Sequence, residues 1–135
     1  MKKIKYFLAE SILGKDELIN LTKCIKSNWI SSTGKFIPEF EKKFSKYLGG
    51  GYAVAVSNGT TAIELALASL GVKRGDEIIL PNFTFAATVE VIALLNLKPV
   101  LVDVDLISFN IDCEKLEKAI TPKTEAIVPV HLFGQ

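Results

Sequence analysis

One polar stretch, SNGTT at residues 57–61, carries residue types that bind an anion. It follows the apolar run YAVAV and precedes AIELALASL, whose apolar spacing predicts a helix. The N–H groups of Gly59, Thr60 and Thr61 would open that helix, where the helix dipole favours an anion. The hydroxyls of Ser57, Thr60 and Thr61 would add donors. We interpret the corner as a phosphate-binding site; the alternative is an ordinary strand-to-helix turn capped by Thr61.

Three further polar corners follow predicted strands. PNFTF contains Phe83 and Phe85, and an aromatic ring at such a corner is suited to stack on a planar ligand. Phe85 could instead begin the apolar face of the next helix. PVHLFG places His131 at another corner, either near a ligand or as a hydrogen-bonded structural residue. Asp103 and Asp105 in LVDVD could face a ligand, but we expect them to cap a turn.

A phosphate-binding site combined with an aromatic ring that can stack on a ligand predicts a flat, phosphorylated cofactor. Pyridoxal phosphate fits these two features, and flavin mononucleotide would also fit them. The absence of a Walker lysine and of a G-x-G-x-x-G run argues against a nucleoside triphosphate or a dinucleotide.

The corners have to be positioned by an α/β fold. Apolar patterning predicts five helices and four strands, with turn-rich loops between them. Helices are expected at 16–27, 38–48, 61–70, 85–96 and 113–120, and strands at 52–56, 77–80, 99–104 and 126–130. Thr61 and Glu64 have capping-box spacing. Alternating strands and helices predict a mostly parallel sheet with flanking helices, whose ligands lie beyond the carboxyl ends of the strands.

The chain is expected to be one incomplete domain over residues 1–135. Residues 1–50 would form N-terminal helices and a loop, and residues 51–135 the βαβ part. The sequence stops five residues after the strand at 126–130, with no helix to cover it, so we expect it to be the front part of a longer protein.

Composition excludes several functional classes. The net charge is +1, with 16 basic and 15 acidic residues, which gives no electrostatic case for nucleic acid or an anionic membrane. The N-terminal MKKIKYFLAESILG resembles a signal peptide only faintly, because its apolar run is short and interrupted by Glu10. Cys24 and Cys113 have no metal-like spacing and are expected to be reduced, mostly buried thiols. We therefore expect a cytoplasmic protein.

From about Asp16 to Gln135 the chain resembles the DegT/DnrJ/EryC1/StrS family of pyridoxal-phosphate-dependent sugar aminotransferases. The resemblance is carried by WISSTGKFIPEFEKKFSKYLG, AVAVSNGTTAIELALASLGVKRGDEIILPNFTFAATVEVI, PVLVDVD and PVHLFGQ, in this order and spacing. It implies the N-terminal part of the large domain of the fold-type-I, aspartate-aminotransferase-like fold. The stretch SNWISSTGKF is most similar to members that aminate 4-keto sugars on nucleotide carriers, of the perosamine-synthase type.

The resemblance also implies roles. Gly59 and Thr60 would hold the cofactor phosphate, Phe85 would stack on the pyridine ring, and His131 would lie near the cofactor pocket. The loop with Trp29, Ser31 and Thr33 would border the sugar-nucleotide site. Glutamate would supply the amino group, for amino-sugar and cell-surface polysaccharide biosynthesis, and the full-length enzyme would be a homodimer.

Two residues of the family's chemistry are missing from these 135 residues. The Schiff-base lysine and the aspartate that keeps the pyridine nitrogen protonated would both lie beyond Gln135, and no lysine here replaces the first. The short chain alone is therefore expected to be inactive. Two alternatives remain open. The full protein could be a sugar 3-dehydratase of the same family, with histidine in place of the lysine, or the chain could be a non-catalytic fragment or small phosphate-ligand-binding module.

Overall fold

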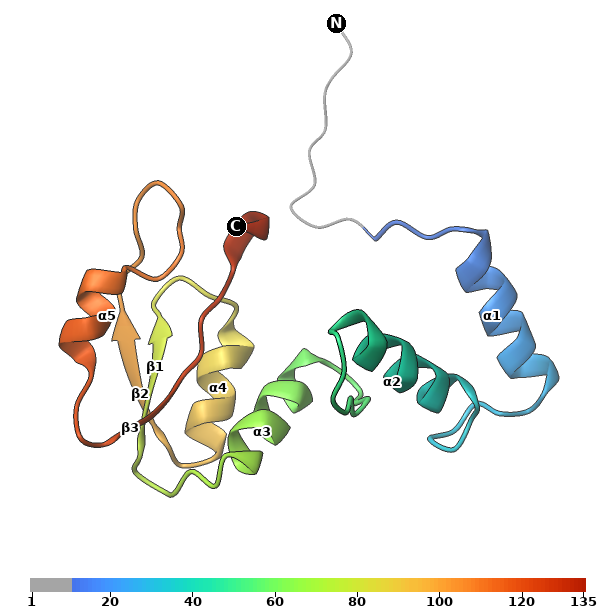
Figure 1. Ribbon diagram of the computed structural model, residues 1–135, viewed down its shortest axis with the longest axis horizontal. Helices are drawn as coiled ribbons and strands as arrows, with labels where there is room; N and C mark the ends of the chain where they lie inside the picture. Colours follow the sequence, from blue (N-terminus) through green and yellow to red (C-terminus); the bar gives the residue numbers. More distant parts are fainter. Residues whose placement is uncertain (1–10) are drawn as a thin grey trace, which may run out of the picture. The chain divides into compact units, whose positions relative to one another are not determined.

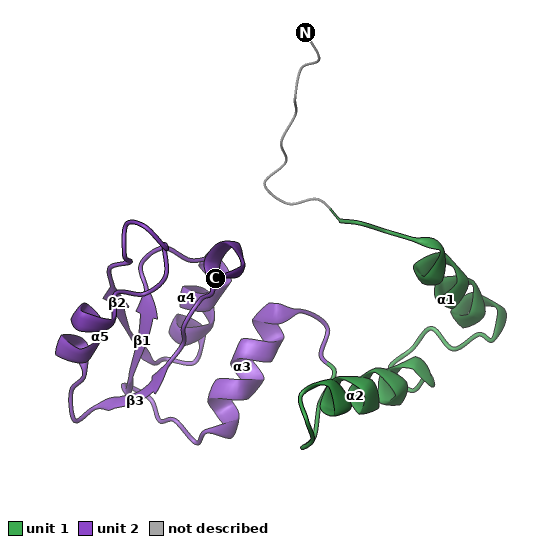
Figure 2. Ribbon diagram, turned by 45° about the horizontal axis from the view of Figure 1, so that its top comes forward, with its two compact units in different colours: residues 1–55 green, residues 56–135 purple. Residues whose placement is uncertain are grey.

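The computed structural model describes residues 11–135, which form two compact units. The first ends at Ala55 and the second runs from Val56 to Gln135 (Figure 2). The sequence predicts the boundary between the two parts of the chain at residues 50 and 51 instead. That both units belong to one large domain stays a prediction. Residues 1–10, which include most of the faintly signal-like stretch, lie outside the described part of the chain.

The first unit contains two helices, as predicted. Helix α1 spans Lys15–Lys26 and helix α2 spans Phe36–Tyr47. Asp16 and Glu17 lie in the first turn of α1 and basic residues in its last, an arrangement that complements the helix dipole. The Glu17 carboxylate accepts the Gly14 N–H at 2.7 Å. Hydrogen bonds from the backbone of Glu17 itself and then of Gly14 lower the pKa of Glu17. Helix α2 starts two residues before Pro38, so the proline lies in the first turn.

The predicted strand at residues 52–56 is wrong. This segment is irregular, and Tyr52 and Val54 are exposed. A strand needs a neighbour for its N–H and C=O groups, and no described strand pairs with this segment. Its Ala55 N–H is instead bound by the Glu41 carboxylate of α2 at 2.8 Å.

The second unit has the predicted order of helices and strands. Its elements are α3 (Gly59–Ser69), β1 (Glu77–Pro81), α4 (Ala86–Leu94), β2 (Lys98–Val102), α5 (Cys113–Ala119), β3 (Thr124–Ile127) and the short 3₁₀ helix η1 (Leu132–Gly134). The strands pair in the order β2-β1-β3, and both pairs are parallel (Figure 1). The predicted strands at 77–80, 99–104 and 126–130 are thus confirmed, with ends shifted by at most three residues.

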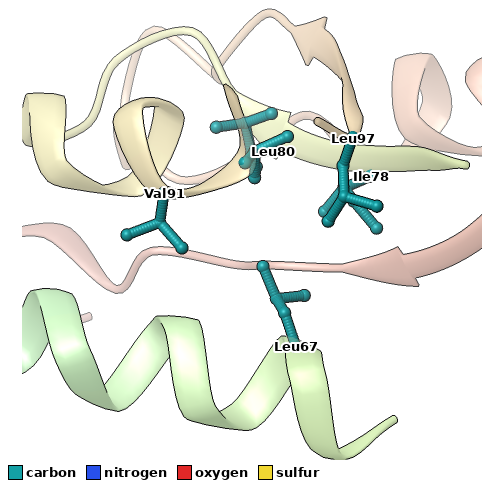
Figure 3. Packing of buried hydrophobic residues seen from close by; sticks show 6 residues of the cluster. Leu67, Ile78, Leu80, Val91 and Leu97 are labelled. Atoms are coloured by element: carbon teal, nitrogen blue, oxygen red, sulfur yellow. The ribbon is translucent and has the colours of Figure 1, made fainter. Parts of the chain in front are cut away.

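The core of this unit surrounds the central strand. Every residue of β1 is buried, and its apolar run 78–81 is typical of a strand in the middle of a parallel sheet. Leu67 of α3 and Val91 of α4 point toward one another (Figure 3). Together with β1 they form one cluster, which consists of Leu67, Ile78, Leu80, Val91, Ile92 and Leu97.

The amino end of β1 is fixed by a buried carboxylate. Glu77, 6% exposed, accepts the Thr121 hydroxyl at 2.6 Å and the Lys98 ammonium at 2.9 Å. The hydrogen bond from Thr121, followed by the one from Lys98, lowers the pKa of Glu77. This group joins β2 and the segment before β3 to the central strand, at the end of the sheet opposite the polar corners.

Two expectations from composition have structural outcomes. Among residues 11–135, none of the helices combines the length and the apolar character needed to cross a membrane. Both cysteines are free, but only Cys24 is even half-buried. The expectation of a buried thiol is wrong for Cys113, which is exposed because it begins α5 directly after the N-cap Asp112.

Candidate cofactor site

The SNGTT corner begins a helix, but its cap is not the one predicted. Helix α3 starts at Gly59, and Asn58 occupies the N-cap position with extended backbone angles. The Asn58 Oδ1 accepts the Thr61 N–H at 2.9 Å and the Thr61 hydroxyl at 3.2 Å. The predicted start at Thr61, with Glu64 as the capping-box partner, is therefore wrong. Asparagine is among the best N-cap residues, and its position here leaves Thr61 as the third residue of the helix.

This cap decides which donors the corner offers. The Thr61 N–H is occupied by Asn58 and is not free for a ligand. The N–H groups of Gly59 and Thr60 lie in the first turn, where a helix has no acceptor of its own, and both residues are exposed. The hydroxyls of Ser57 and Thr61 lie 3.4 Å apart beside them. Two backbone donors, nearby hydroxyls and the positive end of the helix dipole can hold a phosphate.

Gly59 has no conformational reason to be glycine. Its φ lies outside the left-handed region, and a Cβ built on it would meet no protein atom within 4 Å. The protein itself therefore tolerates a larger residue here. A side chain at this position would instead occupy space in front of the first N–H groups, where a bound ligand has to approach.

The second corner presents a free aromatic ring. Phe85 is the N-cap residue of α4, and its side chain is 81% exposed. The buried face of α4 is formed by Ala87, Thr88, Val91 and Ile92, so the interpretation of Phe85 as the start of the apolar face is wrong. Figure 1 shows α3 and α4 beginning at the end of the unit toward which the β1 arrow points. The SNGTT corner and the exposed ring of Phe85 thus lie at the same edge of the sheet.

His131 lies after the third strand, at the same edge. It is exposed and immediately precedes η1. No described residue forms a hydrogen bond with its ring, which does not support the interpretation of His131 as a hydrogen-bonded structural residue.

The two aspartates after β2 differ in role. Asp105 caps its turn as expected, because its Oδ1 accepts the Ser108 N–H at 2.8 Å and the Ser108 hydroxyl at 2.9 Å. These bonds lower the pKa of Asp105. Asp103 does not cap a turn through its carboxylate. It accepts a hydrogen bond from the Asn82 amide and pairs with the Lys115 ammonium at 3.2 Å, which raises the pKa of Lys115.

The three residues expected to border the sugar-nucleotide site belong to the first unit. Trp29, Ser31 and Thr33 lie in the turn-rich loop between α1 and α2, and all three are exposed. The hydroxyls of Ser31 and Thr33 lie 3.2 Å apart. The loop therefore presents an indole and two adjacent hydroxyl groups, which are suited to contact a polar planar ligand.

Sequence reasoning missed two residues that shape the edge. Asn58 selects which N–H groups stay free, and Asn82 joins the end of β1 to the loop after β2. The first has a local signal, because asparagine just before a helix start is a good N-cap residue, but Thr61 offers a competing one. The second has no local signal, because its partner Asp103 is 21 positions away.

These features define an α/β protein with exposed backbone and hydroxyl donors at the carboxyl edge of a parallel sheet. The chain belongs to the DegT/DnrJ/EryC1/StrS aminotransferase family, whose family model matches residues 11–135. The family predicted from the sequence is thus confirmed.

Individual relatives differ in the reaction that their names give. The chain is 50% identical over 113 residues to a GDP-perosamine synthase of Caulobacter vibrioides, covering 84% of this chain and 30% of that protein. It is 46% identical over 102 residues to a UDP-2-acetamido-2-deoxy-3-oxo-D-glucuronate aminotransferase of Pseudomonas aeruginosa, covering 76% and 28%. The chain therefore spans about a third of the length of these relatives.

A solved structure confirms the fold. The GDP-4-keto-6-deoxy-D-mannose-3-dehydratase of Escherichia coli, with bound hydrated PLP, matches 97% of this chain and 35% of its own, at 35% identity and a TM-score of 0.86. The predicted α/β fold of the pyridoxal-phosphate-dependent aminotransferase type is thus confirmed.

Proposed function

We propose that this chain is the N-terminal portion of an aminotransferase that moves an amino group from glutamate to a keto-sugar nucleotide. The observation that carries the proposal is the 50% identity to a GDP-perosamine synthase over 84% of the chain. The full-length protein would be the enzyme, and these 135 residues alone would be inactive. Its product would serve amino-sugar and cell-surface polysaccharide synthesis, in the cytoplasm.

The cofactor that we assign is pyridoxal phosphate. The free N–H groups of Gly59 and Thr60, with the hydroxyls of Thr60 and Ser57, suit its phosphate. The Thr61 hydroxyl would join them on giving up its bond to the Asn58 Oδ1. The exposed ring of Phe85 suits its pyridine face, and His131 lies at the same edge. When bound, the cofactor would carry the amino group between the two substrates. The role of this chain's own residues is to hold the phosphate and orient the ring.

The substrate that we assign is a 4-keto sugar nucleotide. The loop with Trp29, Ser31 and Thr33 would border it, because this loop presents an aromatic ring and paired hydroxyls. Amination at C4 is favoured over C3 because the stretch SNWISSTGKF resembles family members of the perosamine-synthase type, and a GDP-perosamine synthase shares 50% identity with this chain. A homodimer of the full-length enzyme is part of the proposal.

Product analysis with the native full-length protein tests this function. The protein would be incubated with pyridoxal phosphate, ¹⁵N-glutamate and GDP-4-keto-6-deoxymannose, and the sugar product examined by NMR. We expect ¹⁵N on C4 and one equivalent of 2-oxoglutarate. Nitrogen on C3 of a 3-keto substrate, with none on C4 of the 4-keto substrate, would contradict the assigned position.

A sugar 3-dehydratase is the second candidate, and the match to the Escherichia coli dehydratase over 97% of the chain favours it. In the same experiment a dehydratase would release the C3 hydroxyl as water and the nitrogen as ¹⁵N-ammonium, with glutamate oxidised to 2-oxoglutarate, and it would leave no ¹⁵N in the sugar. A full-length protein that binds the cofactor but changes neither substrate would leave the third alternative, a non-catalytic binding module.

A further inference from the structure

The loop between β2 and α5 contains a closed turn at residues 105–110. The Asp105 N–H donates to the Asn110 carbonyl and the Phe109 N–H donates to the Asp105 carbonyl, both at 2.9 Å. An isolated antiparallel bridge between Val104 and Ile111 closes the base of the turn. With the Asp105 carboxylate bonded to Ser108, the turn is fixed from both its backbone and its side chains.

This turn contacts both neighbouring loops of the carboxyl edge. The Phe109 ring lies 5.9 Å from the Phe83 ring and 6.1 Å from the Phe133 ring, centre to centre. The second pair is edge-to-face, at 87°, which is a favoured aromatic geometry. The Leu132 N–H donates to the Asn110 Oδ1 at 3.2 Å and is shared with the Val130 carbonyl, also at 3.2 Å. Phe83 precedes Phe85 by two residues, and Leu132 and Phe133 directly follow His131.

The backbone at these contacts is unusual. Phe109 and Phe133 have φ angles of 58° and 55°, in the left-handed region that bulky residues rarely adopt. Such conformations persist only where the surroundings hold them. Here the two strained phenylalanines contact each other. The residue after Phe109, Asn110, is bonded to the residue before Phe133, Leu132.

We propose that Phe109 and Asn110 are positioning residues. They hold residues 131–134 at the carboxyl edge of the sheet and thereby place His131 beside the candidate cofactor corner. Neither residue is among those assigned to bind cofactor or substrate. That Phe109 and Asn110 hold residues 131–134 does not depend on the reaction that the protein catalyses. That they thereby affect cofactor binding rests on the proposed function.

The single histidine of the chain makes the placement measurable. In the full-length protein its ring signals in a ¹H–¹³C spectrum would be assigned by their loss in His131→Gln, and the Leu132 amide exchange rate reports on the bond to Asn110. The Asn110→Ala variant removes the side-chain acceptor and leaves the Val130 carbonyl in place. Asn110→Asp keeps an oxygen at the same place, and Asn20→Ala, an exposed asparagine on α1, is the matched control.

We expect Asn110→Ala to shift the His131 signals and to speed Leu132 exchange by roughly fivefold, the loss expected for one hydrogen bond. Asn110→Asp should restore both, and Asn20→Ala should change neither. Phe109→Leu should shift the His131 signals while leaving the Asn110 bond in place. Unchanged His131 signals in both Asn110→Ala and Phe109→Leu, with the unfolding midpoint retained, would overturn the proposal.

A ligand measurement separates this proposal from the proposed function. Pyridoxamine 5′-phosphate is the probe, because it has no aldehyde to react with surface lysines. We expect Asn110→Ala to weaken its binding about fivefold and Asn110→Asp to restore it. Equal binding by Asn110→Ala and the wild type would overturn the positioning role at the cofactor corner. If the full-length wild-type protein does not bind the probe, the cofactor assignment fails, while the histidine spectra still decide whether the turn holds residues 131–134.

Discussion

Replacing Gly59 by alanine should separate folding from ligand binding. Gly59 is the first residue of α3, has an unstrained φ and has no protein atom within 4 Å of the built Cβ. Alanine reduces the conformational freedom of the unfolded chain and fits a helix better. We therefore expect the free energy of unfolding to rise by about 0.4–1 kcal/mol.

The same substitution should weaken phosphate binding. Side chains in a helix tilt toward its N-terminus, so the new methyl group would extend toward the free N–H groups of Gly59 and Thr60. A hydrogen bond to a charged partner is worth about 1.5–3 kcal/mol, so displacement from one such bond corresponds to roughly a tenfold to hundredfold weaker dissociation constant. Urea unfolding and titration with pyridoxamine 5′-phosphate measure the two effects on one sample.

Gly71 provides the matched control, because it follows the other end of the same helix. Its φ is 73°, so alanine there is strained and should lower stability by about 1–2 kcal/mol without a direct effect on the ligand. The reasoning is refuted if Gly59→Ala binds the probe as tightly as the wild type. It is equally refuted if Gly59→Ala loses stability as Gly71→Ala does, because the glycine would then serve the backbone.

Three further outcomes concern the second unit. Asn58→Ala should lower stability to urea by about 1 kcal/mol, since the Thr61 N–H loses its cap. Leu67→Ala, at a side chain 3% exposed, should cost about 2–5 kcal/mol in thermal unfolding. The pKa of Glu77 is lowered from its ordinary 4.5, so its contribution to stability is present above pH 4.5 and is lost as the pH falls through the lowered value. Glu77→Gln should therefore show a flatter loss of stability in acid titrations than the wild type, and an unchanged acid limb would contradict the assignment.

Much of the fold could be predicted because its signals are local. The continuous apolar run of β1 and the helical spacing in α3 and α4 indicate their structures without any partner. The strand predicted at 52–56 failed for the opposite reason. An apolar run becomes a strand only beside a neighbour, and no described strand pairs with this one.

The candidate site was predictable in its residue types but less so in its bonds. SNGTT indicates a helix start with donors, yet Asn58 and Thr61 are both good caps, and only the structure shows that Asn58 occupies the position. The pairing of Asp103 with Asn82 and Lys115 joins residues distant in the chain. Local sequence patterns carry no information about such contacts.

The most direct test of the central claim is to locate the phosphate on the wild-type chain. A ¹H–¹⁵N spectrum would be followed during titration with pyridoxamine 5′-phosphate, and with pyridoxamine as the control that lacks the phosphate. We predict that the Gly59 and Thr60 amide signals move with the phosphorylated compound and not with the control, while the capped Thr61 amide moves less. Shifts confined to other residues, or equal shifts with both compounds, would contradict the assignment of this corner as the phosphate-binding site.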